Sequence, residues 1–256
     1  MNYKPLTTLS IAAPAYNEAE CISEVVELWY GYLKKDQSLS AFEIVICNDG
    51  SVDDTAKILI RLSSRYPEVR VVEHKRNKGA AAALTTAIHN TSYDWVLLLD
   101  TDGQFPIENL AYFRKAMEVS ASLSYIGCRS EKQDTLFARF GSWSSGFVCN
   151  LFLRTRYSDF NSACKLVDGR LLRWLRLESK GLNYSTDITA KLVEAGFAPT
   201  EVDICHEKRV SGKSNRAVIR DAFQRFMFVS YIIFRQLLFL FNVLQRPSDL
   251  EDGPYA

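Results

Sequence analysis

The chain has 256 residues, with 31 Lys and Arg against 30 Asp and Glu, so its formal net charge at pH 7 is +1. This near-neutral charge excludes a strongly basic nucleic-acid-binding protein, and we expect no nucleic-acid partner. Apolar residues make up 47% of the chain, which is sufficient for the core of one large α/β domain.

The six cysteines are scattered and form no C-x-x-C pair, a distribution typical of reduced, buried thiols in a cytosolic protein. The first residues lead directly into a strand-like segment and lack the apolar core of a signal peptide. No run of about twenty uninterrupted apolar residues is present, so the sequence predicts no simple transmembrane helix. We therefore expect a catalytic domain that faces the cytoplasm.

The first half of the sequence alternates short apolar runs with helical patterns. The apolar runs are continuous or rich in β-branched residues, and they predict strands at Leu9–Ala13, Phe42–Cys47, Val69–Glu73 and Trp95–Leu99. The intervening segments predict helices at Glu18–Lys35, Asp53–Tyr66 and Lys78–Asn90. Asp53 is the expected N-cap of the second helix. This alternation predicts an α/β fold with a mostly parallel sheet flanked by helices.

Beyond residue 105 the pattern is less regular. An apolar run predicts a further strand at Leu123–Cys128, and alternation of polar and apolar residues predicts a last one at Thr200–Cys205. Helical periodicity predicts three further helices, at Leu136–Leu153, Leu171–Leu177 and Thr186–Ala195. Gly196 is the expected C-cap of the last of them. We predict a catalytic domain over residues 1–212, an amphipathic helical extension over 213–246 and a disordered tail over 247–256.

Polar segments follow three of the predicted strands. They are Pro14–Glu18, Asn48–Asp53 and Asp100–Gln104. Each alone is an ordinary turn sequence. The carboxyl ends of parallel strands lie at one edge of a sheet, however, and ligands bind there in open α/β folds. The coincidence of all three segments at that edge predicts a ligand-binding site.

A metal site is predicted within the third of these segments. Asp100 and Asp102 share a face if the chain stays extended, because side chains two residues apart point the same way. Two carboxylates and the amide oxygen of Gln104 suit Mg²⁺ or Mn²⁺ and not zinc. Such a metal keeps water ligands and takes oxygens from substrate phosphates.

The neighbouring strand ends carry residues suited to a nucleotide. Asp49 and Glu18 are spare acids, placed to accept hydrogen bonds from a nucleoside's base and ribose. Arg76–Gly79 brings two cations and a glycine to a helix start, where a diphosphate can be held. For Lys78 alone, a solvated surface lysine is the alternative interpretation.

These motifs, together with Asn77–Gly79, resemble the nucleotide-sugar-binding motifs of family 2 glycosyltransferases, which have the GT-A (Rossmann-like) fold. The resemblance covers residues 7–215. It implies an inverting hexosyltransferase that uses a UDP- or GDP-sugar, with the Asp100, Asp102 and Gln104 metal on the diphosphate. It also implies a set of nucleotide-sugar contacts: Pro14, Tyr16, Asn17, Glu18, Asp49, Ser51, Lys78, Gly79, Asp100 and Thr101.

The second half resembles the polyprenyl-phosphate glycosyltransferases, a group that includes dolichyl-phosphate mannose synthase and bacterial enzymes of cell-envelope glycan synthesis. The resemblance lies in four segments: Gly127–Arg129, Phe140–Asn150, Asp159–Lys165 and His206–Ser214. It implies that Asp159 lies in the active site and that an undecaprenyl or dolichyl phosphate is the acceptor. The implied acceptor and phosphate contacts are Arg129, Lys165, Arg209, Lys213 and Ser214.

Three features depart from that pattern and leave the acceptor less determined than the donor. Asn48 stands where the family usually has an acid, and Ser162–Lys165 reads Ser-Ala-Cys-Lys in place of Ser-Gly-Phe-Arg. The third is that the sequence predicts no transmembrane helices after the domain.

Asp187 distinguishes two classes of acceptor. A phosphate oxygen is already anionic near pH 7 and needs no general base, whereas a hydroxyl on a glycan, lipid or protein does. Asp187 occurs in Ser185–Asp187, where processive family members carry a Thr-Glu-Asp base, but it is equally interpreted as a first-turn helix acid. A non-catalytic nucleotide-sugar-binding protein is a further alternative, against which the intact metal motif argues. A nucleotidyltransferase is disfavoured because no Gly-rich phosphate loop lies near the N-terminus.

The segment Asp221–Arg246 predicts an amphipathic helix. At about 100° per residue, the residues that share its apolar face are Phe223, Phe226, Val229, Ile233, Phe234, Leu237, Leu240, Phe241 and Leu244. The polar residues of the opposite half are Arg225, Arg235, Gln236, Asn242 and Arg246.

This pattern predicts peripheral contact at the cytoplasmic face of the inner membrane. Basic residues just upstream are suited to anionic headgroups: Lys208, Arg209, Lys213, Arg216 and Arg220. A spanning helix would place Arg235 near the bilayer centre at a cost of about 2.5–3.5 kcal/mol or more. The alternative is that the helix packs on its own domain or in a homo-oligomer.

Overall fold

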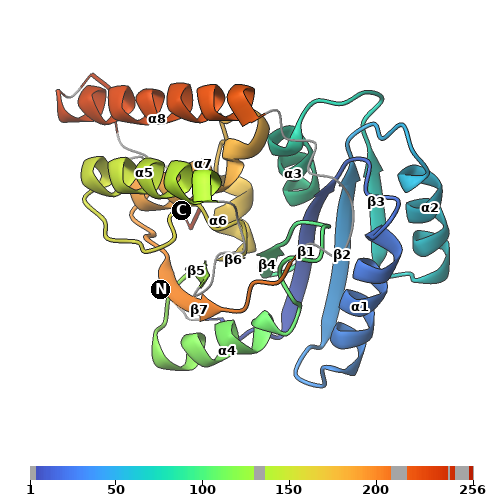
Figure 1. Ribbon diagram of the computed structural model, residues 1–256. Helices are drawn as coiled ribbons and strands as arrows, with labels where there is room; N and C mark the ends of the chain where they lie inside the picture. The colour runs from blue at the N-terminus through green and yellow to red at the C-terminus, as the bar shows by residue number, and fades with distance from the viewer. Residues whose placement is uncertain (1–3, 130–135, 209–217, 242, 246–253, 256) are drawn as a thin grey trace.

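The computed structural model of the chain describes residues 4–129, 136–208, 218–241, 243–245 and 254–255, with the backbone alone for 136–142, 182 and 218–222. Within these residues, seven strands form one sheet in the order β3-β2-β1-β4-β6-β5-β7 (Figure 1). The strands are β1 (Thr8–Ala15), β2 (Ala41–Asn48), β3 (Val69–Glu73), β4 (Trp95–Leu98), β5 (Ser124–Arg129), β6 (Lys165–Asp168) and β7 (Thr200–Ile204).

Helices connect these strands and cover both faces of the sheet. The α-helices are α1 (Ile22–Lys35), α2 (Thr55–Arg65), α3 (Ala80–His89), α4 (Asn109–Val119), α5 (Leu136–Leu153), α6 (Gly169–Trp174), α7 (Tyr184–Glu194) and α8 (Val218–Leu240). A short 3-10 helix, η1 (Gly181–Asn183), leads into α7. The GT-A-like α/β fold predicted from the sequence is confirmed.

Strand direction decides which residues gather at the functional edge. Strand β1 pairs in parallel with β2 and β4, so Ala15 at the end of β1 lies opposite Asn48 at the end of β2. Strand β6 runs antiparallel to β4, so its first residue, Lys165, lies opposite Leu98. The segment that enters β6 therefore arrives at the edge where the parallel strands end.

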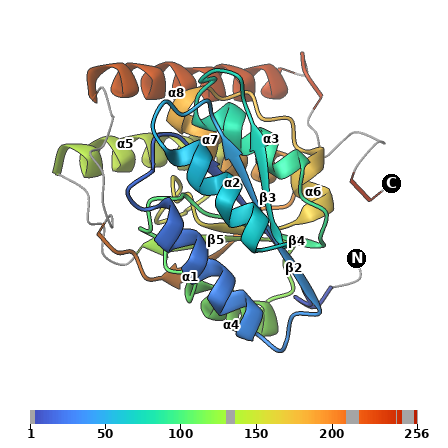
Figure 2. The same cartoon turned by 90° about the vertical axis from the view of Figure 1, so that its right-hand side faces the viewer.

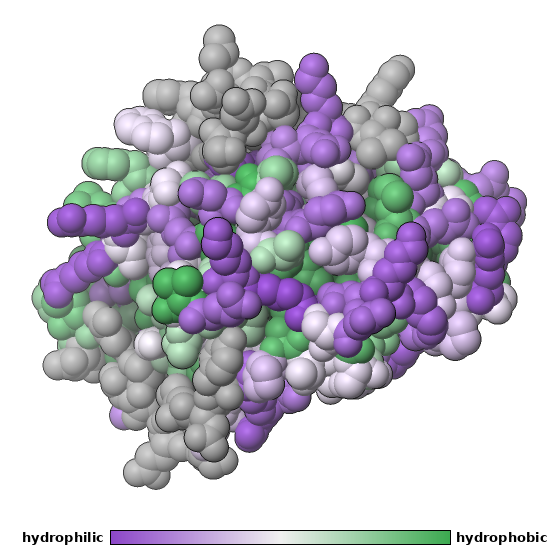
Figure 3. All heavy atoms as spheres, turned by 90° about the horizontal axis from the view of Figure 1, so that it is seen from below, coloured by the Kyte–Doolittle hydropathy of each residue, from purple (hydrophilic) through white to green (hydrophobic). Residues whose placement is uncertain are grey.

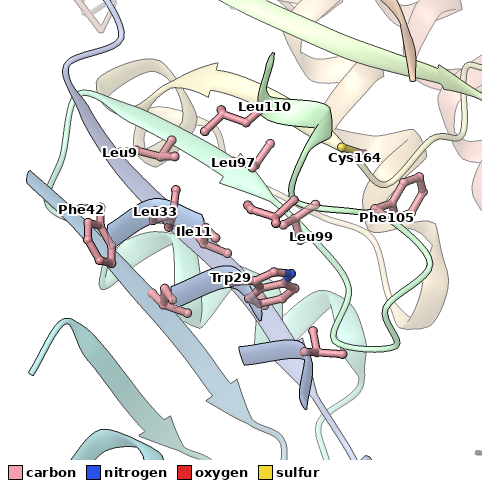
Figure 4. Packing of buried hydrophobic residues seen from close by; sticks show 14 of the residues in the cluster. Leu9, Ile11, Trp29, Leu33, Phe42, Leu97, Leu99, Phe105, Leu110 and Cys164 are labelled. Carbon is pink, nitrogen blue, oxygen red and sulfur yellow. The ribbon is translucent and has the colours of Figure 1, made fainter. Parts of the chain in front are cut away.

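The core lies on both faces of the sheet. Because side chains alternate along a strand, Ile11 of β1 packs with α1, α2 and α4, whereas Ala12 packs with α3, α6 and α7. Figure 4 shows the first of these layers, to which Leu97 of β4 and Trp29 and Leu33 of α1 belong. Both layers are continuous apolar packing, which holds the strand ends in fixed positions.

The predicted strands and helices are confirmed, apart from shifts at their ends. Helix α1 begins at Ile22 and not at Glu18, because the amides of residues 17–19 donate to side chains of the loop after β2. The N-cap residue of α2 is Asp54 and not the predicted Asp53, although Asp53 Oδ1 accepts the Thr55 amide at 3.0 Å just before the helix. The sequence patterns missed α4, which lies where the alternation of the first half ends, and β6, which has only 4 residues.

Helix α8 lies beside α5, as Figures 1 and 2 show, and its outward face is the apolar one. Phe226 is 66% exposed, whereas Arg235 is only 4% exposed. The expectation that Arg235 and Gln236 face water is therefore wrong. Val229, expected on the outward apolar face, is also buried in the protein. Arg235 can be buried because the carboxylate of Glu194, on α7 beneath the helix, pairs with its positive charge.

The contact between α8 and α7 is a buried ion-pair network. Arg235 donates from Nε and Nη2 to Glu194 Oε1 at 3.1 and 2.9 Å, and from Nη1 to Glu178 Oε2 at 2.7 Å. Gln236 Nε2 donates to the same Glu194 oxygen at 2.5 Å. These bonds fix the rotation of α8 about its axis.

Among the described residues, one helical segment, Phe223–Leu240, is long and apolar enough to cross a membrane by length and composition alone, and 28% of it is buried in the protein. Its arginines interrupt the apolar run, which is why the sequence predicts no simple transmembrane helix.

The prediction of a disordered tail over 247–256 falls mostly outside the described residues. Tyr255 is described, and its ring lies 5.9 Å from that of Phe197, centroid to centroid. The Arg170 guanidinium lies 5.4 Å from the same tyrosine ring.

Replacing Arg235 by alanine should destabilise the protein by about 3–5 kcal/mol, because Glu194 would be left buried without its cation. The double variant R235M/E194Q should lose less than the two single changes together. Urea unfolding followed by circular dichroism measures both, with the exposed Lys57→Ala as the control. An R235A midpoint equal to that of the wild type would show that the network does not hold α8.

Candidate functional site

The loops after β1 and β2 are interlocked. The Asn17 amide donates to Ser51 Oγ at 3.0 Å, and the Val52 amide donates to Asn17 Oδ1 at 2.9 Å. The Glu18 amide donates to Thr55 Oγ1 at 2.9 Å. Asn17 adopts a φ of 55°, an unusual value for a residue other than glycine. The structure thus brings together three predicted donor-binding residues, Asn17, Glu18 and Ser51, and fixes their backbone.

Asp49 holds the loop that precedes α3. Its Oδ1 lies 2.6 Å from His74 Nδ1 and accepts the Lys78 amide at 2.9 Å, while Oδ2 accepts the Gly79 amide at 2.7 Å. Gly50 lies against this loop, since a Cβ there would come within 2.6 Å of the Arg76 carbonyl carbon. Asp49 is therefore not a spare acid, and its contact with a nucleoside stays a prediction.

The backbone amides at the start of α3 do not all point outward, as they would in a simple phosphate-binding helix start. Gly79 has a φ of 95° and precedes the helix, as a glycine can without strain. The amides of Lys78 and Gly79 are directed to Asp49. The side chains of Arg76 and Lys78 are both exposed, and a contact of Lys78 with a diphosphate stays a prediction.

The segment after β4 joins the site to two other parts of the chain. Thr101 Oγ1 donates to the Pro14 carbonyl at 3.1 Å, which ties this segment to the end of β1. The Gln104 amide donates to Asp102 Oδ1 at 3.1 Å, and the Gln104 carbonyl accepts the Glu207 amide at 2.9 Å. The segment after β7 therefore returns beside the D-x-D motif.

The metal prediction rests on oxygen ligands. Among the described residues no group of three or more His, Cys, Asp or Glu side chains gathers as a complete metal cage. Asp100 and Asp102 are two carboxylates on one short segment at the sheet edge. This sparse, all-oxygen set fits Mg²⁺ or Mn²⁺, which takes its other ligands from water and substrate phosphates.

Asp159 and Arg129 form a two-bonded ion pair. Arg129 Nε donates to Asp159 Oδ2 at 2.6 Å, and Nη2 donates to Oδ1 at 3.0 Å. Asp159 is 2% exposed and the Arg129 side chain 11%. The sequence placed both residues in the active site, and the structure joins them, so each orients the other.

Lys165 is buried. Its Nζ donates to the Ser162 carbonyl and, at 3.0 Å, to Ser185 Oγ. Burial lowers the pKa of Lys165 to about 7, against the opposing effect of Asp159. A contact between Lys165 and an acceptor phosphate would require the side chain to leave this position, and it stays a prediction.

Asp187 lies in the first turn of α7 and is fully buried. Its Oδ2 accepts the amides of Glu178 and Ser179 at 2.6 and 2.8 Å. Burial raises the pKa of Asp187, and the two amides lower it in part. This geometry is that of a helix acid that holds the preceding segment.

The remaining predicted phosphate contacts, Arg209, Lys213 and Ser214, lie outside the described residues. Two residues that sequence reasoning missed belong to the site. His74 directly follows β3, so the strand-end rule could have found it. Tyr184 donates to Asp100 Oδ1 at 2.5 Å across 84 residues of sequence, a pairing that no local pattern signals.

A family model described as Glycosyl transferase family 2 matches residues 10–173, and the chain belongs to this family. It is therefore a glycosyltransferase, as the sequence motifs predict. The matched region contains the D-x-D segment, both interlocked loops and the Asp159–Arg129 pair.

Curated relatives share only part of their length with this chain. Dolichyl-phosphate beta-glucosyltransferase ALG5A of Trichomonas vaginalis is 31% identical over 133 residues, which are 49% of this chain and 41% of the relative. Undecaprenyl-phosphate 4-deoxy-4-formamido-L-arabinose transferase of Photorhabdus laumondii is 28% identical over 56% of this chain and 43% of the relative. The chain thus spans less than half the length of these two relatives.

Solved structures share the fold. Glucosyl-3-phosphoglycerate synthase from Mycobacterium tuberculosis, in complex with Mn²⁺, UDP-glucose and phosphoglyceric acid, has a TM-score of 0.65 at 18% identity, covering 91% of this chain and 79% of that one. S. aureus TarS has a TM-score of 0.58 at 18% identity, with 96% and 67% covered.

Asp187→Asn should retain most of the activity, because an amide oxygen can still accept the bonds from Glu178 and Ser179. Asp187→Ala should lose stability by about 1–3 kcal/mol, since two buried amides lose their acceptor. Turnover and thermal unfolding of the two variants measure this difference. Equal, severe loss of turnover in both, with normal unfolding, would instead identify Asp187 as a general base.

Proposed function

We propose that this protein is an inverting, metal-dependent glycosyltransferase that moves a hexose from a UDP- or GDP-sugar to a polyprenyl phosphate. The observation that carries the proposal is the D-x-D segment at the sheet edge, joined by hydrogen bonds to the donor loops of a family 2 chain. The two relatives named for transfer to dolichyl and undecaprenyl phosphate support this class of acceptor.

The residues divide the chemistry between donor and acceptor. Asp100, Asp102 and Gln104 would hold Mg²⁺ or Mn²⁺, which supplies positive charge to the diphosphate as it leaves. The nucleoside lies against the loops of Asn17 and Ser51. Lys78 adds a mobile cation at the diphosphate, where charge builds up during transfer.

The transfer step needs one new bond and one broken bond. An oxygen of the acceptor phosphate attacks the anomeric carbon, and the bond from that carbon to the nucleoside diphosphate breaks, with inversion. The attacking oxygen is anionic near pH 7, so no residue has to take a proton from it. Arg129, whose guanidinium is oriented by Asp159, supplies the positive charge for the acceptor phosphate.

The alternative is a hydroxyl acceptor on a glycan, lipid or protein, with Asp187 as the base. The phosphate acceptor is favoured because Asp187 Oδ2 holds two backbone amides inside the protein. Binding of a nucleotide sugar without any transfer would favour the second alternative, a non-catalytic binding protein.

Membrane contact is the remaining part of the proposal. The α5–α8 surface consists of exposed apolar side chains on these two helices: Trp143, Phe147, Leu151, Phe223, Phe226, Phe234, Leu237 and Leu240. The face of the molecule away from α8 is mostly hydrophilic, as Figure 3 shows. A polyprenyl acceptor resides in a bilayer, so we place this surface on the cytoplasmic leaflet, with α8 lying in the interface.

Incubation with radiolabelled UDP- and GDP-sugars, Mn²⁺ and polyprenyl phosphate should give an organic-extractable labelled lipid. EDTA should abolish the label, and Asp102→Ala should lower it about a hundredfold or more, because several kcal/mol of charge stabilisation are lost. The exposed Asp54→Ala is the control. Donor binding without labelled lipid would refute the polyprenyl acceptor.

The wild type should float with vesicles that contain anionic lipid, and the double variant F226E/F234E should bind at least about tenfold more weakly, because two apolar side chains leave the bilayer. Val119→Glu, an exposed apolar position on α4, is the matched control. A dimer in light scattering that the double variant disrupts, with no flotation of the wild type, would assign the surface to self-association.

A further inference from the structure

Tyr184 contacts the metal-binding segment from outside it. Its hydroxyl donates to Asp100 Oδ1 at 2.5 Å, and the tyrosine is 5% exposed. Tyr184 is the first residue of α7, whereas Asp100 directly follows the apolar run of β4. The orientation of the Asp100 carboxylate, which lies after a strand, is therefore set by Tyr184 of helix α7.

The segment that precedes Tyr184 is held at several points. The Asp187 carboxylate accepts the Glu178 and Ser179 amides, as described above. The Glu178 carboxylate accepts bonds at Oε2 from Lys191 at 2.6 Å, Arg235 at 2.7 Å and Tyr231 at 2.8 Å. Two of these three donors belong to α8, so α8 contributes to the position of Tyr184.

The same segment lies between α8 and the donor loop. A Cβ on Gly181 would lie 2.7 Å from Gln224 Oε1 of α8. A Cβ on Gly79, at the start of α3, would lie 3.8 Å from the Gly181 nitrogen. Residues 178–184 thus form a packed connection from α8 to the site.

We propose that Tyr184 is a positioning residue that orients Asp100 for the divalent metal, and that the contacts of Glu178 hold Tyr184 in place. The inference rests on the metal-dependent function proposed above. A hydrogen bond to a metal-binding carboxylate fixes its orientation, and loss of such a bond typically weakens metal binding about 10–100-fold. The tyrosine keeps its proton throughout and does not contact the reacting atoms.

The test is Mn²⁺ binding to the full chain saturated with UDP, and in parallel with GDP, measured by the electron paramagnetic resonance of free Mn²⁺. Tyr184→Phe removes the hydroxyl alone and should weaken Mn²⁺ binding roughly 10-fold or more. Nucleotide affinity without metal and the thermal midpoint should stay unchanged. Excess Mn²⁺ should restore turnover, because a misoriented ligand weakens metal binding without removing it.

Two further variants separate this role from a general structural one. Tyr112→Phe, on the exposed side of α4, should bind Mn²⁺ like the wild type. Glu178→Ala keeps every side chain of the site but removes the acceptor that holds the segment before Tyr184. It should weaken Mn²⁺ binding in the same direction but less than Tyr184→Phe.

Three outcomes would overturn the proposal. Equal Mn²⁺ affinity in Tyr184→Phe and wild type would show that the tyrosine does not position Asp100. Joint loss of metal-free nucleotide affinity and thermal stability in Tyr184→Phe would show a purely structural role. Absence of Mn²⁺ binding in the wild type with either nucleotide would refute the metal site itself, and the inference with it.

Discussion

The direction of β6 is the constraint on which the site depends. Strands β1, β2 and β4 run in parallel and end at one edge, which gathers their three polar loops. A β6 parallel to β4 would have run toward that edge and started away from it. Because β6 instead starts there and runs antiparallel to β4, the preceding segment brings Asp159 close to Arg129 at the end of β5. Hydrogen bonding within the sheet thus places the Asp159–Arg129 pair beside the loops that follow the parallel strands.

Buried carboxylates fix the loops around this edge. Asp49 holds the start of α3, Asp187 holds the segment before α7, and Glu194 holds α8. Each accepts hydrogen bonds from groups outside its own helix or loop, and a bond to a charged group contributes about 1.5–3 kcal/mol. The acids of this protein therefore divide into a supporting set and the pair in the D-x-D segment. This division explains how a site built from loops can keep a defined geometry.

The sequence predicted most of the fold, because the buried strands of the first half are strongly apolar and their connecting helices are periodic. It also predicted the loops of the site, since turn-forming residues followed three of four strands. It could not show that Asp49 and Asp187 have backbone partners, because such bonds depend on the path of a loop and not on residue type. The Tyr184–Asp100 contact was missed for the same reason, as two ordinary residues meet only in the folded chain. The start of α1 shifted because the amides of residues 17–19 found side-chain partners.

The orientation of α8 shows how a charged residue can determine which surface a protein exposes. Amphipathic periodicity alone assigns Arg235 to solvent, but burial against Glu194 and Glu178 turns the helix so that Phe226 and Phe234 face outward. Removing apolar surface from water would favour the opposite rotation, so the ion pairs and the packing of Phe228 and Ile232 against α5 and α7 must outweigh it. An outward apolar face is stable in water only at a cost, and that cost disappears where the face meets an apolar environment. The same ion pairs reach Glu178 and the segment before Tyr184, so the interactions that expose the apolar face also hold the segment that leads to the Tyr184–Asp100 hydrogen bond.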